Sequence, residues 1–134
     1  GRYLRRSPAG VRGLMPKHLE SVEQRLFVQR FRLDRDTRDL PACAIPNGGR
    51  RGAREAGILK AEGVTAGAPD WILMVPRGPF CGLALEFKAP IGPVRVSPAQ
   101  TAFLERLARH GWSVHLVRNA HDAWQHVTDY LSLV

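Results

Sequence analysis

Three residues near the middle of the chain carry side chains that could form a hydrolytic metal site. Asp70 precedes an apolar run over 71–75, and Glu86 and Lys88 lie in a second run over 83–88. Two carboxylates at one point are typical of an oxygen-rich site that binds Mg²⁺ together with waters and a substrate phosphate. A lysine beside them can orient or deprotonate an attacking water, or stabilise the charge that develops on a phosphoryl group.

The two apolar runs are predicted to pair as a β-hairpin, because the segment between them contains two prolines and two glycines. Side chains alternate along a strand, so the two charged residues of the second strand project from one face. If Val75 pairs with Gly82, Asp70 lies opposite Phe87 and next to both of them. A purely structural ion pair between Glu86 and Lys88 is the alternative explanation.

A third carboxylate is expected from the first helix. Apolar residues recur at helical spacing over 19–33, which predicts an amphipathic helix. At about 100° per residue, Glu23 falls inside the apolar arc and Glu20 nearer its edge. A carboxylate in a core-facing stripe is costly unless it is paired or binds a cation. Glu23 is therefore the predicted site residue, and an ion pair with Arg30 on the same face is the alternative.

The order of the other elements predicts an α/β fold with one mixed sheet flanked by helices. Ser97, Pro98 and Gln100 give a helix start with an N-cap, a proline at the first position and a capping-box glutamine. Gly111 ends that helix. The expected elements are helices over 19–33, 50–62, 97–111 and 119–134, a buried strand over 42–45, and strands over 71–75, 83–88 and 113–117.

The charge balance points to a polyanionic partner. The chain has 134 residues with 20 Lys+Arg and 12 Asp+Glu, which gives a net charge of +8. Nucleic-acid binding commonly leaves such an excess, although solubility alone tolerates it. Residues 1–17 contain only basic charges and predict a flexible basic arm, followed by one domain over 18–134. No membrane span or signal peptide is recognisable, so a cytoplasmic protein is expected.

Other chemistries lack their motifs. The five histidines and two cysteines do not combine in a zinc spacing. A phosphate-binding Gly-x-x-x-x-Gly-Lys-Ser/Thr loop and a Gly-x-Ser-x-Gly elbow are both missing from the sequence. Neither nucleotide-triphosphate hydrolysis nor serine-hydrolase chemistry has support, and no nucleotide cofactor is expected.

The run Pro69-Asp70, fifteen intervening residues and Glu86-Phe87-Lys88 resembles the PD-(D/E)XK motif of restriction-endonuclease-like nucleases. The segments around it are similar, in the same succession, to the VRR-NUC family in the small stand-alone form found in phages and bacteria. The likeness extends from residue 18 to the C-terminus. The segments are Glu23-Gln24, 44–51, 59–64, 67–70, 85–88 and 97–100.

The resemblance implies a restriction-endonuclease-like core, with a central sheet of about four strands and the active site where the hairpin strands diverge. It implies Mg²⁺ or Mn²⁺ bound by Asp70, Glu86 and the backbone carbonyl of Phe87, with Glu23 completing the site directly or through a water. Lys88 would activate or position the attacking water. Gln100 would line the site in addition to capping its helix. Residues suited to phosphate contact are Asn47, Arg50, Arg51 and Lys60.

The expected protein is a metal-dependent DNA endonuclease of replication, repair or recombination in a bacterial or phage-infected cell. It would leave a 5′-phosphate, act on branched or four-way-junction DNA and work as a homodimer. An exonuclease or flap nuclease with the same site, and a non-catalytic DNA-binding module, are the alternatives. An RNA-associated protein is disfavoured, because most aromatic residues fall in predicted core elements rather than at exposed stacking positions.

Overall fold

The computed structural model describes residues 15–46 and 52–134, with side chains from residue 19 onward. Most of the predicted basic arm therefore lies outside the described residues. The elements follow the order expected from the sequence. They are α1 (Met15–Leu33), β1 (Ala42–Ala44), α2 (Ala53–Ala61), β2 (Trp71–Leu73), β3 (Gly82–Phe87), α3 (Pro98–Arg109), β4 (Trp112–Val117) and α4 (Ala120–Leu131).

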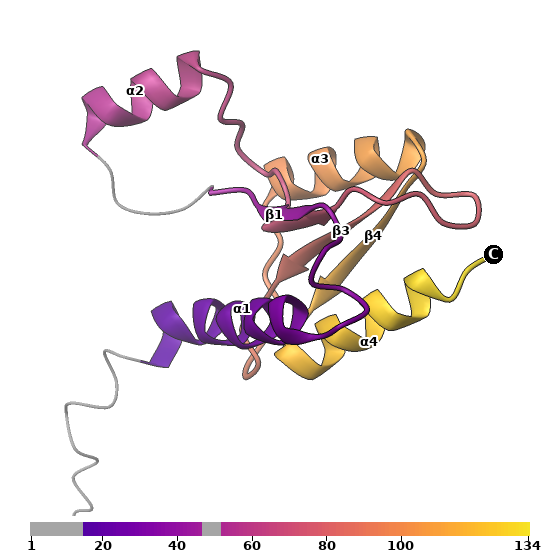
Figure 1. Cartoon of the computed structure of the whole chain (residues 1–134). Coiled ribbons are helices and arrows are strands. Elements are labelled where there is room, and N and C mark those ends of the chain that lie inside the picture. The colour runs from indigo at the N-terminus through magenta and orange to yellow at the C-terminus, as the bar shows by residue number, and fades with distance from the viewer. Residues whose placement is uncertain (1–14, 47–51) are drawn as a thin grey trace, which may run out of the picture.

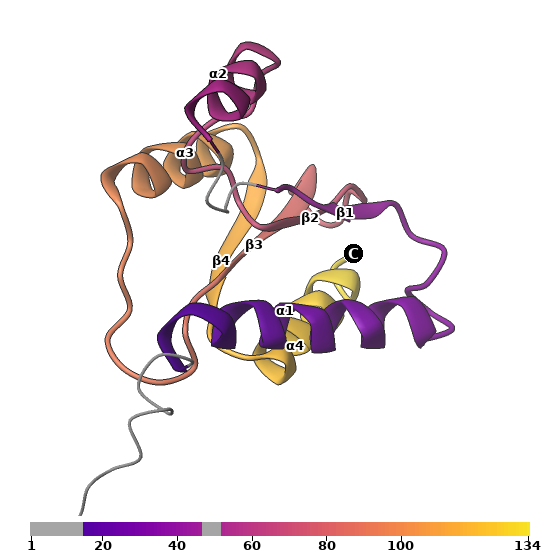
Figure 2. The same ribbon diagram turned by 90° about the vertical axis from the view of Figure 1, so that its left-hand side faces the viewer.

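The strands form one mixed sheet in the order β1-β2-β3-β4. The pairs β1–β2 and β2–β3 are antiparallel. The pair β3–β4 is parallel, and α3 connects its two strands. Helices α1 and α4 cover one face of the sheet and α3 covers the other (Figure 1, Figure 2). This is the predicted α/β arrangement. No helix in the described part of the chain is long and apolar enough to cross a membrane.

The main core lies between the sheet and the α1–α4 layer. Phe27 of α1 meets Trp71 of β2 edge to face, with ring centroids 4.8 Å apart, an arrangement that aromatic pairs favour. Alternate residues of β3 complete this face, since Leu83, Leu85 and Phe87 are almost fully buried in the same cluster. The side chains between them therefore point to the opposite face, toward α3.

Helix α3 begins with the predicted capping box. The Ser97 hydroxyl accepts from the Gln100 backbone N–H, and the Gln100 side chain accepts from the Ser97 N–H, with Pro98 in the first turn. Gly111 follows the helix with a φ of 92°, which a glycine adopts without strain. The start of α3 and the orientation of Gln100 are thus fixed by local sequence.

The hairpin register differs by one residue from the predicted register. Trp71 pairs with Leu85, although the tip keeps the predicted offset, with Arg77 opposite Phe80. Between these pairs the chain has five residues on the β2 side and four on the β3 side, so the extra residue forms a bulge. The Tyr130 hydroxyl of α4 donates to the Val75 carbonyl in this segment at 2.5 Å. The shift extends the pairing so that Asp70 comes beside Glu86 rather than opposite Phe87.

Two elements are largely exposed, and for one of them, β1, the sequence predicted burial. The strand β1 was predicted to be buried, but it is a short edge strand, and Cys43 and Ala44 are exposed. Helix α2 has no buried residue, and both views show it projecting beyond α3, away from the sheet (Figure 1, Figure 2). Since little packing holds α2 to the core, its orientation is not needed for the stability of the sheet.

Candidate active site

The α3-facing side of the sheet brings four predicted site residues together. Glu86 and Lys88 project from β3, with Lys88 Nζ 3.7 Å from Glu86 Oε1, and Asp70 lies just before β2. The Asp70 Oδ2 atom accepts from the backbone N–H of Phe87 at 2.7 Å. Gln100, at the start of α3, donates from Nε2 to Glu86 Oε1 at 2.8 Å. Both strand residues are buried, with exposed fractions of 4% for Glu86 and 6% for Lys88.

Gln100 performs both roles that the sequence left open. Its Oε1 accepts from the Ser97 N–H at 3.0 Å and from Lys88 Nζ at 2.9 Å, while its amide group reaches Glu86. The residue that caps α3 therefore also holds the lysine and the glutamate of β3. Because its carbonyl oxygen is fixed by the helix cap, its amide is preorganised to donate toward the carboxylate.

Gly67 keeps the loop that carries Asp70 tight against α3. Its φ of 88° lies in the left-handed region, and a Cβ at this position would lie 2.2 Å from the backbone oxygen of Ala99. A side chain here would have to separate the loop from the start of α3. The glycine is thus a condition for Asp70 and Gln100 to share one site.

Burial gives the two carboxyl groups unusual proton affinities. Loss of hydration, together with the nearby Asp70 charge, raises the pKa of Glu86 to about 8 even though Lys88 opposes the shift. Burial also raises the pKa of Asp70, against the opposing effect of its hydrogen bond with Phe87. The two carboxyls interact directly, so one proton is shared in this region near neutral pH.

The residues present fit a divalent cation. Oε2 of Glu86 is buried and has no hydrogen-bond donor among the described residues when both carboxyls are ionised. A cation between Glu86 and Asp70 would satisfy this oxygen and replace the shared proton. No group of three or more His, Cys, Asp or Glu side chains in the described ranges is arranged to hold a metal. Mg²⁺ accommodates such a site, since it takes one or two carboxylates and completes its shell with water and phosphate oxygens.

The metal-free protein is expected to lose stability as the pH rises from 5 to 8. The unfolded chain releases the Glu86 proton near 4.5, whereas the folded state keeps it to about pH 8. The free energy of unfolding should fall by about 2 to 4 kcal/mol across this window, and Glu86→Gln should remove the fall. Denaturant unfolding of both proteins in EDTA, at pH values from 5 to 8, measures this fall in stability.

The quantity to compare across pH is the difference in unfolding free energy between the parent and Glu86→Gln. Burial lowers the pKa of His115, so its contribution to stability rises with pH near 6 in both proteins and cancels. If the difference in unfolding free energy between the parent and Glu86→Gln is the same at pH 8 as at pH 5, Glu86 does not hold a proton in the folded state.

The two glutamates of α1 occupy different surroundings. The Glu23 carboxylate accepts from the backbone N–H of Ala120 at 2.8 Å and so caps the start of α4. Arg30, its predicted alternative partner, lies over the Trp124 ring instead, 4.4 Å from the centroid. Glu20 lines a cavity with Lys88. Of the two, Glu20 is therefore the one that the fold brings to the lysine side of the site.

Substituting the two glutamates separately is expected to separate catalysis from folding. Glu20→Gln should slow cleavage about tenfold or more with little change in stability, because it removes a charge beside Lys88. Glu23→Gln should instead lower the free energy of unfolding by about 1 kcal/mol, since an amide is a weaker cap for α4. Cleavage rates and unfolding curves of both proteins test this. The assignment fails if Glu23→Gln is the slower enzyme at equal stability.

The cavity beside Lys88 has a volume of about 350 Å³ and adds a residue that the sequence did not single out. Arg95 lines it, in the exposed loop between β3 and α3, together with Glu20 and Lys88. Arg118 holds this loop by donating to the carbonyls of Ala89 and Gly92. The only signal in the sequence for Arg95 was that it is the one basic residue between Lys88 and Ser97.

Of the residues predicted to contact phosphates, the structure describes one. Lys60 lies in the last turn of α2 and is exposed. It is carried by the helix that projects from the body of the protein, so it is not part of the buried site. Asn47, Arg50 and Arg51 lie outside the described residues.

Comparisons with known proteins point to one family. Residues 12–121 match the family model of the VRR-NUC domain. A solved structure named VRR_NUC domain protein superposes with a TM-score of 0.73 at 26% sequence identity, covering 86% of this chain and 89% of the other. No curated protein matches the chain. The family model covers most of the described residues, including the strands and helices that form the site, and the chain belongs to the VRR-NUC domain family of nucleases.

Proposed function

We propose that the protein is a Mg²⁺- or Mn²⁺-dependent DNA endonuclease that hydrolyses phosphodiester bonds at the Asp70–Glu86–Lys88 site. The observation that carries the proposal is the carboxylate pair of buried Glu86 and half-buried Asp70, in which Oε2 of Glu86 lacks a donor among the described residues. Such a pair is destabilising unless a proton or a cation occupies it. A structural ion pair with Lys88 would leave this oxygen unexplained.

Each residue has a distinct part in the proposed reaction. Asp70 and Glu86 would hold the cation, with the Phe87 carbonyl as a further ligand. The bound cation would act as a Lewis acid toward the scissile phosphate and lower the pKa of a coordinated water. Lys88, fixed by Gln100, orients the attacking water and offsets negative charge on the phosphate. Arg95 contacts the same phosphate group from the cavity.

The preferred substrate in this proposal is branched DNA, with the four-way junction as the leading case. The described residues of one chain form one such site, so paired cuts in two strands would need two copies, which favours a homodimer. Helix α2 supports contact with DNA outside the site, because it extends from the body and carries Arg54 and Lys60 on an exposed surface. The charges on this helix would contact phosphates without reading the base sequence.

Cleavage of a panel of end-labelled DNAs tests the proposal. Duplex, flap, fork and four-way-junction substrates are incubated with Mg²⁺, Mn²⁺ or EDTA. Symmetric paired cuts in the junction, only with metal, are expected, and light scattering should give the mass of a dimer. Cutting only at free ends or flaps would show that those structures, and not the four-way junction, are the substrate. No metal-dependent product on any DNA would overturn the nuclease proposal for this chain.

Metal binding has a second readout that does not depend on cleavage. Mg²⁺ at pH 8 should raise the melting temperature of the parent, because it binds the folded carboxylate pair and not the unfolded chain. Glu86→Gln should show little of this shift. If both proteins respond equally to Mg²⁺, the cation binds elsewhere.

A further inference from the structure

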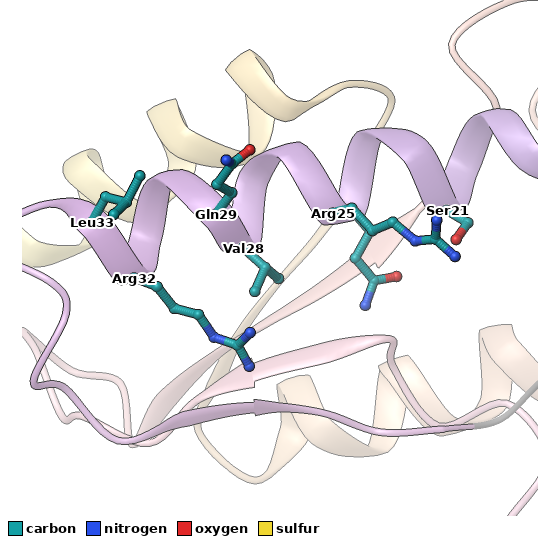
Figure 3. Close-up of a pocket in the computed structure, with 7 residues that line it drawn as sticks. Ser21, Arg25, Val28, Gln29, Arg32 and Leu33 are labelled. Atoms are coloured by element: carbon teal, nitrogen blue, oxygen red, sulfur yellow. The ribbon is translucent and has the colours of Figure 1, made fainter.

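The exposed side of α1 carries a basic groove outside the active site. It has a volume of about 580 Å³, and Figure 3 shows Arg25, Val28 and Arg32 projecting from one side of the helix in successive turns. The lining consists of two arginines, two glutamines, a serine and two apolar residues, with no carboxylate. These residues are Ser21, Gln24, Arg25, Val28, Gln29, Arg32 and Leu33.

The two arginines of the groove are unpaired. Among the described residues, neither Arg25 nor Arg32 has a hydrogen bond or an ion-pair partner, and both are exposed. Other arginines nearby have a partner of some kind: Arg30 makes a cation–π contact with Trp124, and Arg35 forms an ion pair with Asp36 at 3.8 Å. Two cations kept free in a groove without carboxylates favour an anionic ligand.

Along α1, the groove begins one residue after the last residue that lines the active-site cavity. Glu20 lines the cavity of Lys88, and Ser21, the next residue, is the first of the groove. At about 1.5 Å per helical residue, Arg25 lies about 7 Å and Arg32 about 18 Å from Glu20 along the axis. One strand of duplex DNA places a phosphate about every 3.4 Å along its axis. These distances correspond to about two and about five nucleotides.

We propose that this groove binds the phosphate backbone of the DNA strand that continues from the cleaved bond. Arg25 contacts a phosphate about two nucleotides away and Arg32 one about five nucleotides away, while Ser21 and Gln24, which precede Arg25 along α1, donate to oxygens nearer the cleaved bond. The inference rests on the proposed nuclease function and adds a path for the flanking strand. The two arginines are two helical turns apart, on the same helix whose Glu20 lines the active-site cavity. This placement favours DNA over an acidic protein segment.

Binding measured without cleavage tests the groove. The parent, Arg25→Ala/Arg32→Ala and the control Arg109→Ala, an exposed arginine at the far end of α3, are titrated with four-way-junction DNA in EDTA over a series of salt concentrations. The double variant should bind about tenfold more weakly, and its slope of log affinity against log salt should be shallower by about 2. The control should keep the parental slope.

Phosphate-ethylation interference adds the position of the contacts. Ethylation about two and about five nucleotides from the cleavage position should impair binding of the parent, and these effects should vanish in Arg25→Ala and Arg32→Ala respectively. The proposal that the groove binds DNA is overturned if the variants keep the parental slope of log affinity against log salt, or the parental interference pattern, even if the parent cuts DNA. A parent that binds DNA through the groove but never cuts it would overturn the nuclease proposal alone.

Discussion

Glu86→Gln is expected to lower the rate of DNA cleavage about a thousandfold or more while leaving DNA affinity in EDTA nearly unchanged. The substitution keeps the size of the side chain and an oxygen that can accept from Gln100, whose Nε2 lies 2.8 Å from Glu86 Oε1. It removes the charge that would bind the cation with Asp70. Single-turnover cleavage in Mg²⁺ and filter binding in EDTA measure the two effects.

A matched control separates the site from general charge effects. Glu105→Gln removes an exposed carboxylate from α3, the same helix that supplies Gln100, and should cut at the parental rate. Misfolding is not a competing explanation for Glu86→Gln, because the uncharged side chain should make the metal-free protein more stable at pH 8. Parental cleavage by Glu86→Gln in Mg²⁺ would remove Glu86 from the site.

Gly67→Ala is expected to cost about 3 kcal/mol or more of folding free energy and to abolish most cleavage. Its methyl group would lie 2.2 Å from the Ala99 oxygen and 2.8 Å from the Gln100 nitrogen. The loop before Asp70 must then move off the start of α3, which adds overpacking to the strain of a left-handed alanine. Thermal or denaturant unfolding and the cleavage assay together measure the loss.

Gly63→Ala is the control, because it has the same kind of backbone without the contact. Gly63 has a φ of 105°, and a Cβ there would meet nothing within 4 Å. This variant should lose only about 1 kcal/mol, the strain of the conformation itself, and should cut DNA. Equal losses for both variants would mean that the packing of Gly67 on α3 does not position Asp70.

The sequence predicted the parts of the site that depend on local rules. The capping box placed Gln100 at the first turn of α3, and strand alternation put Glu86 and Lys88 on one face; both are confirmed. These features depend on neighbours within a few residues, so hydrogen-bond chemistry and the period of the strand suffice to derive them.

Contacts between distant segments could not be read in the same way. A helical wheel placed Glu23 on the inner arc of α1, but its partner is the N–H of Ala120, 97 residues away, and no property of the helix alone reveals that contact. The apolar run at β1 did predict a strand. Its place at the edge of the sheet depends on which strands pair, so the expected burial was wrong.

The bulge near the hairpin tip sets a rule for which insertions and deletions the family fold can accept here. The ladder and the tip differ in register by one residue. If the ladder kept the register of the tip, with no bulge to absorb the extra residue, Asp70 would lie opposite Phe87 and turn toward the aromatic core. Removing one residue from each strand would keep Asp70 beside Glu86. Changes in hairpin length should therefore be tolerated in matched pairs, and so should loss of the extra residue itself, whereas a deletion of one residue from the β3 side would enlarge the mismatch to two residues and should inactivate the enzyme.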